Sequence, residues 1–181
     1  KTMTVAQYMN NEGCIWAGDI HQHKCTALSR RVREFGFDMI SVRQQDASAE
    51  PPAELLNRMD RVICDVPCSG LGVIRRKPEI RYKHEEDFTD LPALQYRILE
   101  QGARLVRIGG TLQYSTCTLR PQENQEIAAR FLREHPEFQP KLLPLESCFA
   151  ASGLPVSHEI TLFPHVHGTD GFYIAGFVKM V

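Results

Sequence analysis

The sequence lacks a long apolar run and a strong charge of either sign. None of its 181 residues belongs to a stretch near the roughly 18 apolar residues that a membrane span needs, and no secretory signal is visible. The net charge is −1, so the total alone does not indicate a nucleic-acid partner. Internal repeats and low-complexity tracts are missing too. Apolar and charged contents of 43% and 24% predict one ordinary globular domain without a membrane partner.

The sequence also lacks a Cys-x-x-Cys pair, so we expect no structural zinc site. Its six cysteines could form disulfides in a small secreted protein, but four of them lie inside apolar or helical patterns. The chain has enough hydrophobic residues to fold without such cross-links, which favours a reducing cytoplasm. His165 and His167 could suggest metal ligation, but two histidines alone are more often loop residues, so no metal is expected.

Short apolar stretches alternate with amphipathic helical patterns through most of the chain. The expected strands are Cys14–Ala17, Asp38–Val42, Arg61–Cys64, Thr111–Ser115, Leu142–Leu145, Ile160–Phe163 and Phe172–Val178. The expected helices are Thr2–Met9, His21–Phe35, Leu91–Arg107 and one that begins at Pro121. This alternation predicts an α/β layer structure with a mostly parallel sheet and an antiparallel C-terminal edge.

Two of the expected strands end in turns that carry a cysteine. Cys68 follows the strand-end residue Asp65, and Cys117 follows the strand that ends at Ser115. Ligands bind outside the carboxyl ends of parallel strands, so Asp65, Cys68 and Cys117 are expected to share one cleft. From the spacing alone, either cysteine could be a nucleophile.

Asp19 and Asp46 also follow predicted strands. A carboxylate after the second strand of a nucleotide-binding unit accepts hydrogen bonds from ribose hydroxyls, which suits Asp19, and Asp46 could meet an adenine amino group. The alternatives are a helix cap for Asp19 and a solvated turn for Asp46. Together with Asp65 the series predicts an adenosine-containing cofactor laid across strand ends.

A long irregular stretch from Ser69 to Asp90 is rich in basic residues. Its basic side chains, interleaved with Ile80 and Tyr82, are Arg75, Arg76, Lys77, Arg81 and Lys83. Such a loop suits the phosphate backbone of a nucleic acid. The alternative is an ordinary solvated loop, because acidic residues in the same stretch partly cancel the charge.

Three segments resemble one family. DVPCSG at Asp65–Gly70, GVIRRKPEI at Gly72–Ile80 and YSTCTLRPQEN at Tyr114–Asn124 are similar to the RNA cytosine-C5 methyltransferases of the Sun/Fmu (RsmB) type. Within that family, GVIRRKPEI points to enzymes that act on bacterial 16S ribosomal RNA. The resemblance implies a Rossmann-like class I methyltransferase fold, a single catalytic domain over residues 1–181, S-adenosylmethionine as cofactor and ribosomal RNA as partner.

The resemblance also implies roles for the strand-end residues. Cytosine C5 is too electron-poor to attack a methyl donor, so a thiolate must first add to C6. In the family the cysteine that corresponds to Cys117 makes this attack, and the one that corresponds to Cys68 assists release of the product. Asp65 would hydrogen-bond the cytosine N3/N4 edge near the methionine end of the cofactor, Asp19 would hold the ribose, and Asp46 the adenine. RNA would bind Arg75, Arg76, Lys77 and Arg81.

The match departs from the family pattern at the amino end. Family members carry a Cys-Ala-Ala-Pro-Gly-Gly-Lys-Thr type loop that embraces the cofactor, and this sequence begins at its Lys-Thr, with Lys1 as the last active-site member. We therefore expect an N-terminally truncated catalytic domain that by itself binds the cofactor weakly or not at all. The remaining cysteines match no family motif and are expected in the core: Cys14, Cys25, Cys64 and Cys148.

Three other functions compete with this interpretation. The chain could be a non-catalytic RNA-binding or scaffold fragment, or it could methylate another RNA such as tRNA. It could also be an exocyclic-amine methyltransferase. Those enzymes carry a second proline and an aromatic residue after the strand-end aspartate, whereas this chain has Val66-Pro67-Cys68. The oligomeric state is not indicated by the sequence.

Overall fold

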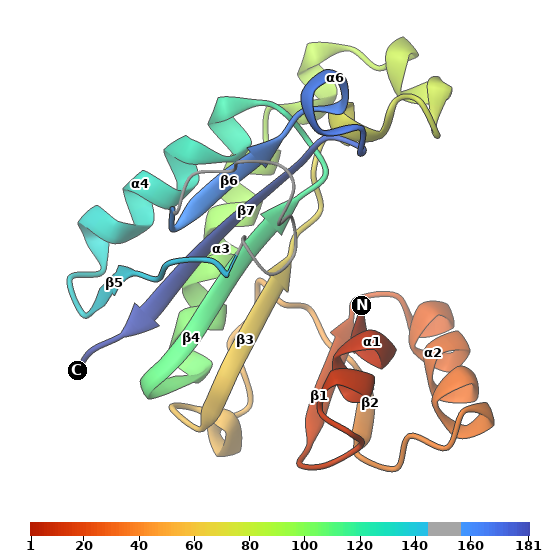
Figure 1. Ribbon diagram of the computed structural model, residues 1–181, viewed down its shortest axis with the longest axis vertical. Helices are drawn as coiled ribbons and strands as arrows, with labels where there is room; N and C mark the ends of the chain where they lie inside the picture. Colours follow the sequence, from red (N-terminus) through yellow and green to blue (C-terminus); the bar gives the residue numbers. More distant parts are fainter. Residues whose placement is uncertain (145–156) are drawn as a thin grey trace. The chain divides into compact units, whose positions relative to one another are not determined.

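The computed structural model of the protein describes residues 1–144 and 157–181. These residues divide into two compact units, Lys1–Ala49 and Glu50–Val181 (Figure 1). Each unit contains its own β-sheet and its own hydrophobic core. Within the described residues, no helix is both long and apolar enough to cross a membrane.

The first unit is a small α/β unit with a parallel strand pair. Its elements are α1 (Thr2–Tyr8), β1 (Ile15–Asp19), α2 (Gln22–Glu34) and β2 (Ile40–Gln44). β1 and β2 pair in parallel from Ile15 opposite Ile40 to Asp19 opposite Gln44. Ala6, Val32 and Ile40 form its buried centre. The connection through α2 is the crossover that a parallel pair requires.

The second unit holds a mixed five-stranded sheet. Its strands are β3 (Met59–Asp65), β4 (Val106–Thr116), β5 (Phe138–Pro140), β6 (Glu159–Leu162) and β7 (Phe172–Lys179). β3 pairs in parallel with β4, whereas β7 pairs antiparallel with β4, β5 and β6. The expected change from parallel to antiparallel pairing at the C-terminal end is confirmed.

Two helices cover one face of this sheet (Figure 1). α3 (Leu91–Leu105) and α4 (Gln125–Glu134) bury Leu99 and Phe131 against Leu112 of β4 and Phe177 of β7. Alternate residues of β4 and β7 point into this core, as the two-residue period of a strand requires. The shorter helices are η1 (Ala53–Leu55), η2 (Leu71–Val73), η3 (Pro78–Tyr82), η4 (Glu85–Phe88), η5 (Pro121–Glu123) and α6 (Pro164–His167).

The boundary between α3 and β4 differs from the sequence-based prediction. The helix ends at Leu105 and the strand already begins at Val106, opposite Met59. The expected helix ran to Arg107, but Gly109 and Gly110 already lie well inside β4, where the register with β3 shifts. Gly109 has φ +76°, and a Cβ on Gly110 would lie 2.9 Å from the Met59 carbonyl oxygen. The glycines therefore permit a bulge in the strand.

Two further predictions were wrong. Residues 142–144 form no strand, because the chain pairs with β7 earlier, at Phe138–Pro140; Leu145 lies outside the described residues. Cys14 is exposed, because it lies in the turn before β1, whereas Cys25 and Cys64 are buried as expected. Cys148 also lies outside the described residues.

Candidate active site

Parallel pairing of β3 and β4 brings the two cysteine motifs together. Asp65 lies opposite Ser115, whose hydroxyl donates a hydrogen bond to the Asp65 carboxylate at 3.3 Å. Beyond these strand ends the Cys68 and Cys117 sulfur atoms lie 3.1 Å apart, and the Cys117 amide donates to the Cys68 sulfur at 3.3 Å. The two thiols, separated by 49 residues in the sequence, are thus in direct contact.

The Cys68 thiol is held in its protonated form. Its hydrogen bond with the Cys117 thiol and its burial raise the pKa of Cys68 far above the ordinary value for cysteine. Burial alone raises the pKa of the Cys64 thiol to about 12. A thiolate, not a thiol, is the nucleophile in cysteine chemistry. This arrangement therefore favours the thiol form of Cys68 over a nucleophilic thiolate.

A buried hydrogen-bond network lies beneath the Cys68 turn. The Glu123 carboxylate, on η5, is fully buried, and its Oε2 accepts hydrogen bonds from the Ser69 amide at 2.9 Å and from Gln95 Nε2 at 2.8 Å. Gln95, on α3, also donates to the Pro67 carbonyl at 2.9 Å. The peptide groups directly before and after Cys68 are therefore fixed by side chains from distant elements.

A second set of buried bonds holds the Cys117 turn. Thr116 Oγ1 donates to Asn124 Oδ1 at 2.6 Å, and Asn124 Nδ2 donates to the Thr118 carbonyl at 3.0 Å. The Ser69 and Thr118 hydroxyls lie 2.7 Å apart and join the two turns directly. Thr116, Thr118 and Asn124 are at most 1% exposed. Buried polar side chains that satisfy one another in this way specify a single arrangement of the turn.

Gly72 ties the segment after the Cys68 turn to the Cys117 turn. Its amide donates to the Cys117 carbonyl at 3.0 Å, and its carbonyl accepts from the Gly171 amide at 2.7 Å. A Cβ on Gly72 would lie only 2.1 Å from the Gly171 carbonyl oxygen. Only glycine allows this close approach of backbones, a function that the sequence did not reveal.

The basic segment is anchored by a buried carboxylate. Asp170, only 4% exposed at its side chain, accepts from Arg76 Nε at 2.7 Å and lies 3.3 Å from Arg75 Nη2. The two arginine side chains remain mostly exposed. Lys77, Arg81 and Tyr82 are exposed as well, Tyr82 to 84%. The segment (yellow-green in Figure 1) is therefore fixed beside the loop after α6 while its basic side chains remain accessible.

In the first unit, the expected cofactor residues have local partners. Asp19 Oδ1 accepts from the His21 amide at 2.8 Å, just before α2, and its Oδ2 lies 3.5 Å from Lys24 Nζ. Asp46 Oδ1 accepts from the amide and the hydroxyl of Ser48 at 2.8 and 2.7 Å. Lys1 precedes α1, and its carbonyl accepts from the Val5 amide. The capping and turn contacts considered from the sequence are present, and they leave a cofactor role open.

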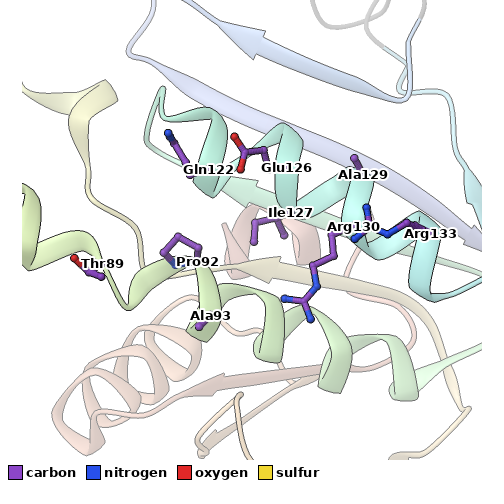
Figure 2. Close-up of a pocket in the computed structure, with 9 residues that line it drawn as sticks. All are labelled: Thr89, Pro92, Ala93, Gln122, Glu126, Ile127, Ala129, Arg130 and Arg133. Atoms are coloured by element: carbon purple, nitrogen blue, oxygen red, sulfur yellow. The ribbon is translucent and has the colours of Figure 1, made fainter.

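A surface pocket is lined by none of the cysteines. It has a volume of about 600 Å³ and lies between α3 and α4 (Figure 2). The residues that line it are Thr89, Pro92, Ala93, Gln122, Glu126, Ile127, Ala129, Arg130 and Arg133. None of the expected site residues is among them. Among residues 1–144 and 157–181, no group of three or more His, Cys, Asp and Glu side chains is placed to hold a metal ion.

Comparisons with known proteins identify the family of the chain. The profile of the family described as 16S rRNA methyltransferase RsmB/F matches residues 1–178. A probable ribosomal RNA small subunit methyltransferase B of Bacillus subtilis is 37% identical over 99% of this chain. That alignment covers 40% of the Bacillus protein, so the chain spans less than half of the length of this relative.

Solved structures show the same fold. The structure of NSun6 from Pyrococcus horikoshii with SFG has a TM-score of 0.81 at 24% identity, over 99% of this chain and 45% of that one. A SAM dependent methyltransferase from Aquifex aeolicus has a TM-score of 0.55 at 10% identity, over 97% of this chain and 73% of that one. The fold is therefore the Rossmann-like fold of these methyltransferases, as the sequence predicted. With the family profile matching nearly every residue, the chain belongs to the 16S rRNA methyltransferase RsmB/F family.

Proposed function

We propose that the protein transfers a methyl group from S-adenosylmethionine to C5 of a cytosine in 16S ribosomal RNA, through a covalent bond between Cys117 and C6. The observation that carries the proposal is the contact of the Cys68 and Cys117 sulfur atoms, 3.1 Å apart at the ends of paired strands. Family membership supports methylation of ribosomal RNA. The two cysteines supply the reason for assigning the reaction to a cytosine ring.

The chemistry requires two groups of different character. Cys117, as a thiolate, adds to C6 and turns the ring into a nucleophile at C5. S-adenosylmethionine, when bound, supplies the methyl group that C5 takes up. After a base has removed the proton from C5, the bond between Cys117 and C6 breaks, and the electron pair returns to the Cys117 sulfur. Cys68, held as a thiol beside that sulfur, is placed to protonate it and so assist release.

Asp65 supplies the negative charge at the same strand ends. In this proposal its carboxylate accepts a hydrogen bond from the N3/N4 edge of the cytosine, which stabilises the charge that builds on the ring. Its bond from Ser115 fixes the carboxylate orientation. The cofactor is assigned to Lys1, Asp19, Asp46 and Asp65, and the two units are proposed to belong to one catalytic domain that works in the cytoplasm.

RNA binding is assigned to the basic segment. Arg75 and Arg76 are anchored by Asp170 yet keep exposed guanidinium groups, which can contact phosphates. Lys77 and Arg81 are exposed on the same segment, and the exposed Tyr82 ring offers a surface on which an unpaired base can stack. Because the segment is tied to the Cys117 turn through Gly72, RNA held there would lie close to the reacting sulfur.

The test compares three variants of the full-length protein with naked 16S ribosomal RNA. Cys117→Ala should lower methyl transfer by on the order of a thousandfold or more, as loss of a nucleophile does. Cys68→Ala should accumulate a covalent protein–RNA adduct, seen as a band that survives denaturing electrophoresis. The double variant should form no adduct.

Cys14→Ala is the matched control, because Cys14 is exposed and lies in the other unit. It should keep the activity and the adduct level of the unmodified protein. Full activity of Cys117→Ala would exclude the proposed nucleophile. Methylation of tRNA but not of ribosomal RNA would assign a different substrate to the same chemistry.

A further inference from the structure

Glu123 is an unexpected residue to find in the core. Its side chain is fully buried, although a buried carboxylate costs several kcal/mol unless hydrogen bonds and an opposite charge compensate. Arg120, 19% exposed at its side chain, places Nε 3.8 Å from Glu123 Oε1. An apolar side chain could fill the same volume at lower cost. The contacts of the carboxylate therefore show what the charge is used for.

Those contacts lie on both sides of Cys68, a residue to which the Glu123 carboxylate itself makes no hydrogen bond. Oε2 of Glu123 accepts from the amide of Ser69, directly after Cys68, and from Gln95, which donates to the carbonyl of Pro67, directly before Cys68. The peptide groups on both sides of Cys68 are thus held by one carboxylate and one amide. The far end of Glu123 is fixed as well, because its backbone carbonyl accepts from the buried Tyr114 hydroxyl at 2.6 Å.

Tyr114 also joins Glu123 to the other cysteine. It lies on β4, three residues before Cys117, and is completely buried. Glu123 consequently links the turn that carries Cys68 to the strand that carries Cys117. Two thiols remain in contact only if both turns are fixed to within about 0.5 Å, a demand that positioned side chains meet better than loops alone.

We propose that Glu123 is a positioning residue for the cysteine pair: through Ser69 and Gln95 it fixes the backbone on both sides of Cys68 and so holds the Cys68 thiol against that of Cys117. Glu123 itself touches neither thiol in the contacts that define the network. The catalytic consequence rests on the proposed function, because only there does Cys68 assist release from Cys117.

The experiment measures the thiols themselves, without RNA or cofactor. In the full-length protein, alkylation of Cys68 and Cys117 by iodoacetamide at pH 8 is followed by peptide mass spectrometry. Glu123→Ala should separate the thiols, and Cys68 should then react about tenfold faster or more, because a thiol freed from that hydrogen bond ionises more readily. Glu123→Gln should stay within about threefold of the unmodified protein, because its amide oxygen can accept both bonds that Oε2 accepts.

Two further variants separate positioning from general stability. Gln95→Met removes only the hydrogen bonds of the Gln95 amide and should give a smaller rise in Cys68 alkylation. This variant keeps the test decisive if Glu123→Ala does not fold. Glu134→Ala is the matched control, because this α4 carboxylate accepts from Tyr96 and Arg130 and none of its bonds goes to the cysteine turns. It should leave alkylation of both cysteines unchanged even if the melting temperature falls.

Methyl transfer then tests the catalytic consequence. Glu123→Ala should lower kcat by about a hundredfold and should lower the KM for RNA with it, because a covalent intermediate accumulates when only its release is slowed. It should also accumulate the covalent RNA adduct, as Cys68→Ala does, and Glu123→Gln should restore turnover.

The outcomes separate this proposal from the proposed function. Unchanged Cys68 alkylation in folded Glu123→Ala and Gln95→Met, or equal effects of Glu123→Ala and Glu123→Gln, would overturn the positioning role. If Glu123→Ala changes alkylation but Cys117→Ala retains full activity, the positioning role stands and the proposed reaction fails.

Discussion

The strand ends of the two units hold their polar side chains in different ways. In the first unit, Asp19 and Asp46 accept hydrogen bonds from His21 and Ser48, two residues further along the chain. In the second unit, Gln95, Cys117 and Glu123 hold the Cys68 turn. Their hydrogen bonds join residues that lie 28 to 54 positions apart in the sequence. The first arrangement is exposed and local, whereas the second is buried and connects several elements.

The difference matches what each set of residues is proposed to do. A carboxylate that binds a ribose or a base must remain accessible to a ligand that enters and leaves, and one local bond is enough to orient it. A pair of thiols must keep contact with each other in the absence of any ligand. That demand requires rigid support from elements distant in the sequence, since loops alone rarely hold such precision.

The largest expected effect comes from breaking the long-range arrangement at Gly72. In Gly72→Ala the new methyl group would lie 2.1 Å from the Gly171 carbonyl and 2.8 Å from that of Cys117, so one of these backbones must move. We expect a loss of about 3 kcal/mol in unfolding free energy, as overpacking causes. Hydrogen-exchange mass spectrometry should show faster exchange in peptides that cover residues 68–73 and 117–119.

The matched change in the first unit is Gly18→Ala. Gly18 lies in β1 with an ordinary φ, and its new methyl group would meet Gln45 at 3.6 Å, a normal contact. Unfolding free energy should change by less than about 1 kcal/mol. Equal effects of the two substitutions would show that the Gly72 contact is not a rigid tie.

The sequence predicted which strand-end residues lie at one edge of the sheet, but not which side chains fix them in position. Asp65, Cys68 and Cys117 could be placed together because the carboxyl ends of parallel strands lie at one edge. Glu123 could not be recognised, because a glutamate two residues after Pro121 is also a common charge in the first turn of a helix. Its burial follows only from the packing of η5 against α3, which local sequence does not specify.

The basic segment shows the same limit. Its charge and its tyrosine, Tyr82, were visible in the sequence, and the helix predicted to begin after it at Leu91 is confirmed as α3. The anchor at Asp170, however, lies about ninety positions away from Arg75 and Arg76, within a loop that has no distinguishing motif. Contacts between distant loops depend on the topology of the whole sheet.

An intermediate effect is expected at Cys68 when its partner is removed. The hydrogen bond with Cys117 is the largest cause of the raised pKa of Cys68, so Cys117→Ala should lower that pKa. A lower pKa means more thiolate at pH 8, and alkylation of Cys68 by iodoacetamide should then become at least about tenfold faster. Cys64 is the internal control, because its pKa is raised by burial alone and should not change. Unaltered Cys68 reactivity would show that the two thiols do not contact each other in solution.

The smallest effect on stability is expected at Asp19, where it separates the two roles that the sequence left open. In Asp19→Asn the amide oxygen can still accept from the His21 amide, and only the exposed ion pair with Lys24 is lost, which contributes little. Unfolding free energy should therefore fall by less than about 1 kcal/mol.

The same substitution tests the cofactor role of Asp19. A carboxylate that accepts from ribose hydroxyls makes charge-assisted bonds, so the affinity for S-adenosylmethionine should fall about tenfold in isothermal titration of the full-length protein. Asp19→Ala should lose both the affinity and the bond before α2. An unchanged affinity in Asp19→Asn would show that Asp19 has only a structural role. The two units would then differ in how their contacts stabilise the fold, and not in ligand binding.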